Sequence, residues 1–325
     1  MQELSLSDKG LFTIIIPSYN HEKYVLDCLE SIKRQKYPQI EIIIVDDYSQ
    51  DNTFALEQKW VDENSKLFLN VVLLRNENNM GVVKTVNRGL NLSHGQYIIR
   101  LASDDCLLDN AVDNIVNEYT LNMSYGMICF DGVVGGNYLE TFQVSDAMPT
   151  MYGNTDYNQK KNLFEDLYRE DFIAAPGCVI MRETYLKLGL YDENSWIDDW
   201  EYYLRIAKNL PVLFSKTKVV FFRQVQNSLS HSPSIKKRKM MNQGVLYVLE
   251  KYKGDVKPQV AKKVMHMRVN LILREVLEWR ENEFLAYVLK YMKRNKITFT
   301  LRSFIKYIII NVTRKKCSKE NNKQF

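Results

Sequence analysis

The sequence predicts an α/β protein, in which a mostly parallel, Rossmann-like sheet flanked by helices is followed by a C-terminal helical extension. Two observations predict the sheet: short apolar runs alternate with longer amphipathic segments from residue 12 onward, and several runs contain three or more consecutive apolar residues, as in strands buried on both faces. The uneven distribution of charge along the chain predicts the C-terminal extension. Residues 1–250 carry 25 Lys and Arg against 33 Asp and Glu, a balance of −8, whereas residues 251–325 carry 19 against 6, a balance of +13.

The N-terminal part of the chain contains four predicted strands with helices between them. The strands are expected where β-branched and aromatic residues concentrate, at 12–16, 40–45, 67–74 and 96–102. Helices are expected where apolar residues recur at helical spacing, at 21–35, 52–64 and 81–93. This alternation implies right-handed crossovers between parallel strands, so a ligand would bind beyond the carboxyl ends of the strands.

Polar side chains follow each of the four predicted strands. The segments are "PSYN" (17–20), "DDYSQD" (46–51), "RNENNMG" (75–81) and "SDDC" (103–106). Since they meet at one edge of the sheet, we expect them to line a polar crevice. Neither G-x-G-x-x-G nor G-x-x-x-x-G-K-[ST] occurs, so a phosphorylated ligand would need another counter-charge, such as a divalent cation held by carboxylates.

The middle of the chain is less regular. Residues 134–172 are polar with several tyrosines, and we expect loops or a mobile flap there. Residues 174–209 then read as a strand, a short helix, a loop and a helix that begins near Asp198. Asp198, Asp199 and Glu201 lie in its first turn, where acidic side chains often only satisfy free amides and the helix dipole. Likewise, an adjacent pair such as Asp104 and Asp105 is by itself typical of a surface loop.

Taken in order, these segments resemble a known family. "IIIPSYNHEKYVLDCLESIKRQKYPQIEIIIVDDYSQDNT", "NENNMGVVKTVNRGLNLSHGQYIIRLASDD" and "MRETYLKLGLYDENSWIDDWEYYLRIA" resemble the inverting, nucleotide-sugar-dependent glycosyltransferases of family 2, which have the GT-A fold. The resemblance covers about residues 10–225. It implies a nucleotide-sugar-binding and catalytic GT-A domain over residues 1–232, with 233–325 as a basic, amphipathic helical region.

The resemblance also implies roles for individual residues. Asp47 would hydrogen-bond the base, which is uracil in many members and guanine or thymine in others. Asp105 would ligate Mg²⁺ or Mn²⁺ on the diphosphate, Asp104 would face the ribose or the sugar, and Asp199 would be the general base. The expected nucleotide-sugar-binding residues are Pro17, Tyr19, Asn20, Asp47, Asn79, Lys84, Ser103 and Asp104.

These residue types suit the chemistry of sugar transfer. A nucleoside diphosphate leaves readily only when its developing charge is neutralised, and a hard divalent cation does this as a Lewis acid. The acceptor hydroxyl must lose its proton as it attacks the anomeric carbon, and a positioned carboxylate can take that proton. Attack from the face opposite the leaving group inverts the anomeric configuration, and no covalent nucleophile is needed.

The chain departs from the family pattern at three places. Asp198 stands where the family usually has Glu, and Val86 stands where a basic residue often occurs, so Lys84 or Arg88 would supply the phosphate contact. The Gln-x-x-Arg-Trp motif of processive polysaccharide synthases is absent, which predicts transfer of one or a few sugars per acceptor. In the segment that replaces it, three side chains either close over the diphosphate or face solvent: Arg223, Ser228 and His231.

The basic C-terminal region allows three interpretations. Residues 257–294 read as one or two amphipathic helices, and 299–316 as a helix with Phe299, Leu301 and Phe304 on one side. Residues 296–316 could lie on an anionic membrane surface, or the helices could pack on the catalytic domain or a second subunit in a homo-oligomer. Nucleic-acid binding is the third interpretation, and the acidic front domain disfavours it.

The remaining expectations concern location and partners. No uncharged apolar stretch reaches the roughly 18 residues of a membrane span, and no secretory signal is evident. We therefore expect a cytoplasmic protein. If the C-terminal helix binds lipid, the protein would be peripheral on the inner face of the cell membrane. The scattered cysteines predict reduced, mostly buried thiols. The resemblance implies a nucleotide-sugar donor and a glycan or lipid-linked glycan acceptor. Nucleotidyl transfer and a catalytically silent binding or assembly subunit are the alternatives.

Overall fold

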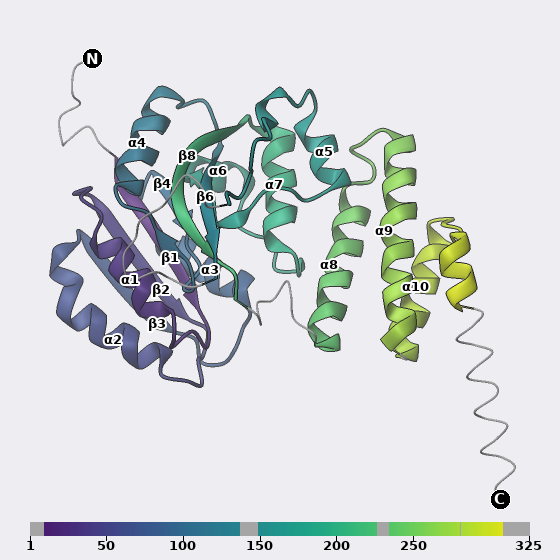
Figure 1. The fold of residues 1–325 in the computed structure, drawn as a ribbon, viewed down its shortest axis with the longest axis horizontal. Coiled ribbons are helices and arrows are strands. Elements are labelled where there is room, and N and C mark those ends of the chain that lie inside the picture. The colour runs from purple at the N-terminus through teal and green to yellow at the C-terminus, as the bar shows by residue number, and fades with distance from the viewer. Residues whose placement is uncertain (1–9, 137–148, 226–233, 280, 308–325) are drawn as a thin grey trace, which may run out of the picture. The chain divides into compact units, whose positions relative to one another are not determined.

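A computed structural model describes residues 10–136, 149–225, 234–279 and 281–307. The chain divides into two compact units (Figure 1). The catalytic unit comprises residues 1–167, 171–194 and 198–228, and the helical unit comprises 168–170, 195–197 and 229–325. The domain boundary expected at residue 232 lies outside the described residues.

The described part of the catalytic unit contains an eight-stranded sheet with the order β3-β2-β1-β4-β7-β6-β8-β5. Strands β3, β2, β1 and β4 are parallel neighbours, whereas β7 runs antiparallel to both β4 and β6. The predicted α/β class with a mostly parallel sheet is therefore confirmed. The strands are β1 (Phe12–Ser18), β2 (Ile40–Asp46), β3 (Asn70–Arg75), β4 (Tyr97–Arg100), β5 (Cys106–Leu107), β6 (Met127–Gly135), β7 (Cys178–Met181) and β8 (Val212–Arg223).

Helices follow the strands in the expected alternation. They are α1 (Val25–Lys33), α2 (Thr53–Asn64), α3 (Val82–Leu92), α4 (Ala111–Leu121), α5 (Leu163–Arg169), α6 (Arg182–Leu188) and α7 (Asp198–Asn209), with short 3-10 turns η2 (Ser65–Leu67), η3 (Tyr157–Gln159) and η4 (Ala175–Gly177). The segment 174–209 thus has the predicted strand, short helix, loop and helix.

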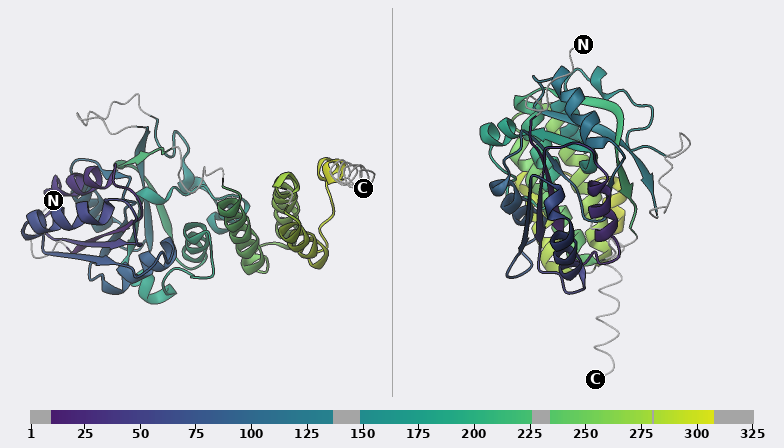
Figure 2. Two further views of the ribbon diagram at one scale, coloured as in Figure 1. Left: turned by 90° about the horizontal axis from the view of Figure 1, so that it is seen from below. Right: turned by 90° about the vertical axis from the view of Figure 1, so that its left-hand side faces the viewer.

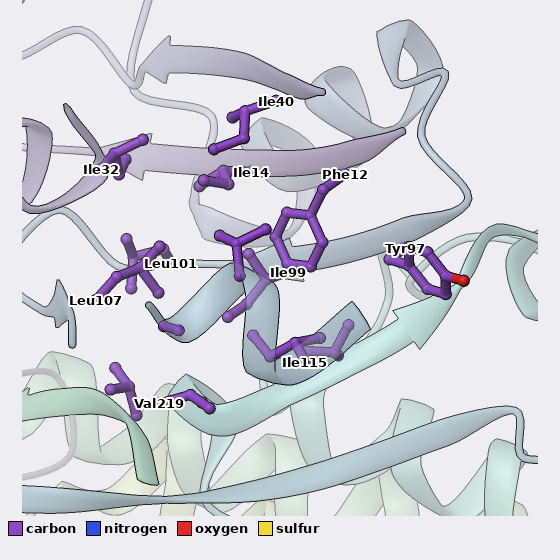
Figure 3. Packing of buried hydrophobic residues seen from close by; sticks show 14 of the residues in the cluster. Phe12, Ile14, Ile32, Ile40, Tyr97, Ile99, Leu101, Leu107, Ile115 and Val219 are labelled. Carbon is purple, nitrogen blue, oxygen red and sulfur yellow. The ribbon is translucent and has the colours of Figure 1, made fainter. Parts of the chain in front are cut away.

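The sheet is buried on both faces where the sequence is continuously apolar. Alternate residues of β1, such as Phe12 and Ile14, belong to a core that also contains Ile32 of α1 and Ile115 of α4 (Figure 3). The opposite face of the sheet contacts α3. Gly89 lies at that contact, because a Cβ there would stand 2.7 Å from Cγ2 of Ile15.

Two expectations about the chain outside this core need correction. The strand expected at 67–74 begins only at Asn70, because Ser65–Leu67 forms a 3-10 turn. Residues 134–172 are not all irregular: Leu163–Arg169 is a helix, and the Tyr157 ring stacks against both Phe172 and Phe214, with centroid distances of 4.8 and 5.0 Å. Aromatic packing therefore orders part of this tyrosine-rich segment. Residues 137–148 of this segment lie outside the described residues.

The helical unit contains α8 (Ile235–Tyr252), α9 (Pro258–Trp279) and α10 (Asn282–Arg294), and residues 301–307 are also helical. Helix α9 packs against both α8 and α10 (Figures 1 and 2). Of the one or two helices predicted over 257–294, the structure has two, α9 and α10. Within the described ranges, no helix is both long and apolar enough to cross a membrane.

Candidate active site

The four polar segments follow β1, β2, β3 and β4, which are parallel neighbours in the sheet. Their carboxyl ends therefore lie along one edge, as the alternation of strands and helices predicted. The segments after β1 and β2 are fixed to each other by hydrogen bonds. The amide of Asn20 donates to Oγ of Ser49 at 2.9 Å, the amide of Gln50 donates to Oδ1 of Asn20 at 2.8 Å, and the amide of His21 donates to Oγ1 of Thr53 at 2.8 Å.

This fixed pair of loops presents two tyrosines to solvent. Tyr19 is 42% exposed and Tyr48 is 41% exposed, whereas the neighbouring Pro17 is half-buried. Asn20 and Tyr48 have positive φ angles of 54° and 65°, a conformation that non-glycine residues adopt rarely. The strained turns hold the rings at the ends of β1 and β2. Of the two tyrosines, the sequence predicted Tyr19 as a site residue but not Tyr48.

Asp46 is buried at the end of β2 and has a structural role. Its carboxylate accepts the amide of Ser49 at 3.0 Å and forms an ion pair with Arg75 at 3.2 Å. The Arg75 guanidinium also lies over the rings of Tyr48, 5.3 Å from its centroid, and Phe54, at 4.9 Å. Arg75 therefore neutralises the buried charge and supports one of the exposed tyrosines.

Asp47 lies at the same edge, and its carboxylate binds the loop that precedes α3. Oδ1 accepts the side-chain amide of Asn76 at 2.8 Å and the backbone amide of Met80 at 2.7 Å, and Oδ2 accepts the amide of Gly81 at 2.8 Å. A carboxylate has about four lone-pair positions, so three acceptor positions are used and one remains on Oδ2. The sequence analysis did not foresee this loop contact.

The two basic residues considered for phosphate binding differ in their surroundings. Nη1 of Arg88 donates to the carbonyl of Arg75 at 3.0 Å and to Oδ1 of Asn76 at 2.6 Å, so Arg88 stabilises the end of β3. Lys84 on α3 is exposed and has no recorded partner within the described residues. Asn79, in the loop before α3, is also exposed. Of the two basic side chains, Lys84 is therefore the one available to contact a phosphate.

His21 joins the predicted residues after β4. Its Nδ1 lies 2.8 Å from Oγ of Ser103, which is fully buried, and 4.0 Å from Oδ1 of Asp104. The sequence analysis did not name His21, although the residue directly follows "PSYN" and histidine commonly binds phosphates or positions carboxylates. Because His21 is part of the fixed loop after β1, it connects that loop to the acidic pair after β4.

Asp105 is almost fully buried, and Arg223 at the end of β8 holds it in place. The Arg223 amide donates to Oδ1 of Asp105 at 2.9 Å, Nε donates to the carbonyl of Asp104 at 2.7 Å, and Nη2 donates to Asp27 at 2.9 Å. The Arg223 guanidinium also lies 5.0 Å from the ring centroid of Tyr24. Arg223 is 5% exposed, so its side chain does not face solvent, and the alternative that it closes over the diphosphate stays a prediction. Ser228 and His231 lie outside the described residues.

The surroundings of Asp105 suit a cation. Burial raises the pKa of this carboxyl well above its ordinary value, and the neighbouring Asp104 raises it further, while the Arg223 amide and charge oppose the shift. No described residue donates a hydrogen bond to its Oδ2. A cation at this oxygen would stabilise the ionised form of Asp105. The described residues contain no group of three or more metal-ligating side chains, so such an ion would need ligands from the substrate, as Mg²⁺ commonly takes from phosphates.

The second acidic cluster lies next to the end of β4. Asp198 forms an ion pair with Arg100, the last residue of β4, whose guanidinium is 5.5 Å from the ring centroid of Tyr191. Asp199 is half-buried, and its Oδ1 accepts the amide of Trp200 at 2.8 Å. Burial raises the pKa of Asp199, and Asp198 raises it further, while Arg100 opposes the shift. The helix-cap interpretation therefore describes only part of this cluster.

The fold and the site together define a class of protein. Paired aspartates after the fourth strand of a Rossmann-like sheet, with another acidic pair beside them, are the arrangement of a GT-A glycosyltransferase. The chain belongs to the family described as Glycosyl transferase family 2, whose model matches residues 13–189. The predicted enzyme class is confirmed.

Individual proteins agree with this membership. The chain is 27% identical over 242 residues to "Glycosyltransferase GlyG" of Streptococcus pneumoniae serotype 4, an alignment covering 63% of this chain and 79% of the relative. The fold is similar to that of mannosyltransferase PcManGT from Pyrobaculum calidifontis in complex with GDP-Man and Mn²⁺, with a TM-score of 0.58, 15% identity and coverage of 95% and 81% of the two chains. It is also similar to S. aureus TarS 1-349 in complex with UDP-GlcNAc, with a TM-score of 0.50, 14% identity and coverage of 89% and 93%.

Proposed function

We propose that this enzyme is a non-processive, inverting glycosyltransferase that moves one sugar, or a few, from a UDP-sugar to an acceptor hydroxyl. We further propose that the acceptor is a lipid-linked glycan in surface polysaccharide synthesis, used at the cytoplasmic face of the cell membrane. The observation that carries the proposal is the meeting of Asp104, Asp105 and the Asp199 cluster beside the end of β4, since Arg100 joins the second cluster to that strand.

The donor would lie along the loops after β1, β2 and β3. Pro17, Tyr19 and Asn20 contact the nucleotide, and the exposed ring of Tyr48 offers a second apolar surface for a base. The remaining acceptor position on Oδ2 of Asp47 takes an N–H of the base. Lys84 contributes the positive charge near the phosphates, and Asn79 and Ser103 complete the polar lining.

A divalent cation, Mn²⁺ or Mg²⁺, would be held by Asp105 and supplies Lewis-acid neutralisation of the leaving diphosphate when bound. The fold neighbour PcManGT, which binds GDP-Man with Mn²⁺, supports this assignment by analogy. Asp104, which is more exposed than Asp105, faces the ribose or the donor sugar. Arg223 has no ligand contact in this proposal and positions the acidic pair.

Asp199 would take the proton of the acceptor hydroxyl. A general base works best when its pKa lies nearer to the working pH than that of an ordinary aspartate, and burial together with Asp198 raises the pKa of Asp199 in that direction. Arg100 neutralises Asp198, so the two adjacent carboxylates do not both carry uncompensated charge. Asp198 is thus a positioning residue and Asp199 the catalytic residue.

The test measures nucleotide release from UDP-, GDP- and dTDP-sugars with a glycan acceptor, with and without Mn²⁺. We expect UDP release that Mn²⁺ stimulates. Asp105→Ala should abolish the stimulation, and Asp199→Asn should abolish transfer while leaving UDP binding nearly unchanged. The matched control is Asp109→Asn, because the Asp109 side chain is 63% exposed and, among the described residues, its ion pair is with surface Arg34.

Two results would contradict the proposal. Full transfer by Asp199→Asn removes the base assignment. Binding of UDP without turnover of any donor supports the alternative of a catalytically silent binding or assembly subunit.

A further inference from the structure

The C-terminal helix of the described chain is attached to α9 through its polar side. Asn270 of α9 is almost fully buried, its side-chain amide donates to the carbonyl of Thr298 at 2.9 Å, and its Oδ1 accepts the amide of Thr300, also at 2.9 Å. Ser303 is fully buried, and its hydroxyl donates to the carbonyl of Asn270 at 3.3 Å. Hydrogen bonds to Asn270 therefore anchor residues 298–303.

The apolar side chains of this helix point away from that attachment. Leu301 is 74% exposed, Phe304 47% and Ile305 48%. On α9, Met267 and Leu271 are also about half exposed. Helices that merely pack on their own protein bury such side chains, as α9 does with Val269 and Leu273. The exposed apolar side of 301–307 is thus available for another surface.

A cavity of about 460 Å³ lies beside this helix and within the size range of small-ligand sites. Three elements line it: α8, α9 and the helix 301–307. Its basic residues are Arg238, Arg268, Arg274 and Lys306, and its acidic residues are Glu275 and Glu278.

The acidic residues do not balance the charge of the cavity. Glu275 forms an ion pair with Arg238, and Glu278 forms one with Lys306. The lining holds four basic side chains and two acidic ones. Arg274 is half-buried, donates only to the carbonyl of Asn270 at 3.4 Å, and has no carboxylate partner among the described residues. The cavity therefore suits an anion.

We propose that this cavity binds the phosphate group of an anionic lipid, while Leu301, Phe304 and Ile305 enter the acyl region of the membrane. The occupant must offer both an anion and an apolar phase, because the cationic cavity and the exposed apolar side chains share the helix that carries Lys306. A lipid surface offers both, whereas a free phosphate or a nucleic acid leaves the apolar side chains in water. The site deepens the membrane association proposed for this enzyme by assigning it a specific lipid-phosphate contact.

The test is sedimentation of the full chain with phosphatidylcholine vesicles, with and without phosphatidylglycerol. We expect binding that requires phosphatidylglycerol. Arg274→Gln should weaken it by about tenfold, since a charge-assisted contact to phosphate is lost. Lys262→Gln is the matched control, because Lys262 is an exposed cation on the same helix that does not line the cavity, and we expect a change below about twofold.

A second pair of variants tests the apolar contact. Leu301→Ser combined with Phe304→Ser should weaken vesicle binding by about tenfold or more. Leu186→Ser is its control, since Leu186 is 73% exposed on the catalytic unit. All five positions that carry these changes are surface positions or cavity walls, and circular dichroism checks that each variant is folded.

Three outcomes would overturn the inference. Equal losses for Arg274→Gln and Lys262→Gln mean that diffuse charge, not the cavity, attracts the membrane. Wild-type binding by the Leu301/Phe304 variant, with displacement by inorganic pyrophosphate, assigns the cavity to a free anion. Preferential binding of single-stranded RNA over vesicles assigns the surface to nucleic acid. Nucleotide release from soluble donors needs no vesicles, so failure here and failure of the proposed transferase activity are distinguishable.

Discussion

Replacing Glu57 with glutamine should remove a strong pH dependence from the stability of the catalytic unit. Glu57 lies on α2 and is fully buried, and neither of its carboxyl oxygens has a hydrogen-bond partner of normal geometry among the described residues. Burial raises the pKa of Glu57 to about 8; Asp46 and Asp51 add to this shift, and the Ser18 hydroxyl opposes it. The folded protein therefore keeps this proton at neutral pH.

The magnitude follows from the difference between the two states. In the unfolded chain the pKa of Glu57 returns to about 4.5, so between about pH 4.5 and pH 8 the folded state holds a proton that the unfolded state has lost. The free energy of unfolding accordingly falls as pH rises through this window, by about 1.4 kcal/mol per pH unit. Between about pH 5 and pH 7, this one group should remove about 3 kcal/mol of stability.

Urea denaturation of the wild type and of Glu57→Gln at several pH values between about 5 and 8 measures this effect. A buried glutamine has its own unmet hydrogen bonds, but their cost does not change with pH and cancels in the slope. We expect the difference in free energy of unfolding between the variant and the wild type to change by about 3 kcal/mol in favour of the variant from pH 5 to pH 7. Glu63→Gln, at an exposed position of the same helix, should show no such gain. If Glu57→Gln and the wild type change in parallel with pH, the buried carboxyl is not the protonated group inferred here.

Two further predictions concern packing and charge. Gly89→Ala should lower the free energy of unfolding by about 1–3 kcal/mol, because the added Cβ would stand 2.7 Å from Ile15. Urea denaturation measures this effect, and an unchanged midpoint would contradict the close contact. Arg100→Gln should lower stability by about 3 kcal/mol by leaving buried Asp198 unpaired. Because Arg100 also lowers the pKa of Asp199, the acidic limb of the pH profile for transfer should move to higher pH, and an unmoved limb would argue against Asp199 as the base.

The central strands could be predicted because their local sequence alone indicates that they are buried. Strands β1 and β2 are apolar at nearly every position and are buried at nearly every position. Strands β6 and β8 were missed because polar residues interrupt them: Asp131 sits in the middle of β6, where the pairing with β8 shifts register, and "SKTK" interrupts β8. Their pairing comes from contacts between distant segments, which a local pattern does not reveal.

The site could be predicted only to the level of which residues gather at the edge of the sheet. The rule that ligands bind beyond the strand ends located Asp104 and Asp105. It could not reveal what else these residues touch, since Arg223 reaches Asp105 across 118 residues of sequence and His21 reaches Ser103 across 82. Nor could it show that Asp47 already binds the loop before α3. Such contacts depend on the packing of whole elements.

Each of the three acidic pairs at this edge is accompanied by an arginine from a different strand end. Arg75 pairs with Asp46, the Arg223 amide binds Asp105, and Arg100 pairs with Asp198. Each guanidinium also lies over a tyrosine ring, at 5.3 Å for Tyr48, 5.0 Å for Tyr24 and 5.5 Å for Tyr191.

This repeated arrangement explains how adjacent carboxylates can stand together in a partly buried edge. Leaving both members of a buried pair ionised and unpaired would cost several kcal/mol, because each charge loses its hydration and repels the other. In the pairs after β2 and at α7, an arginine that is itself held against an aromatic ring compensates one member, Asp46 or Asp198, and the other member is left for a ligand. In the pair at α7 this division is clearest, since Asp198 has the arginine and Asp199 has none. The position of Arg100 therefore supports our proposal that Asp199, and not Asp198, is the functional carboxylate of that pair.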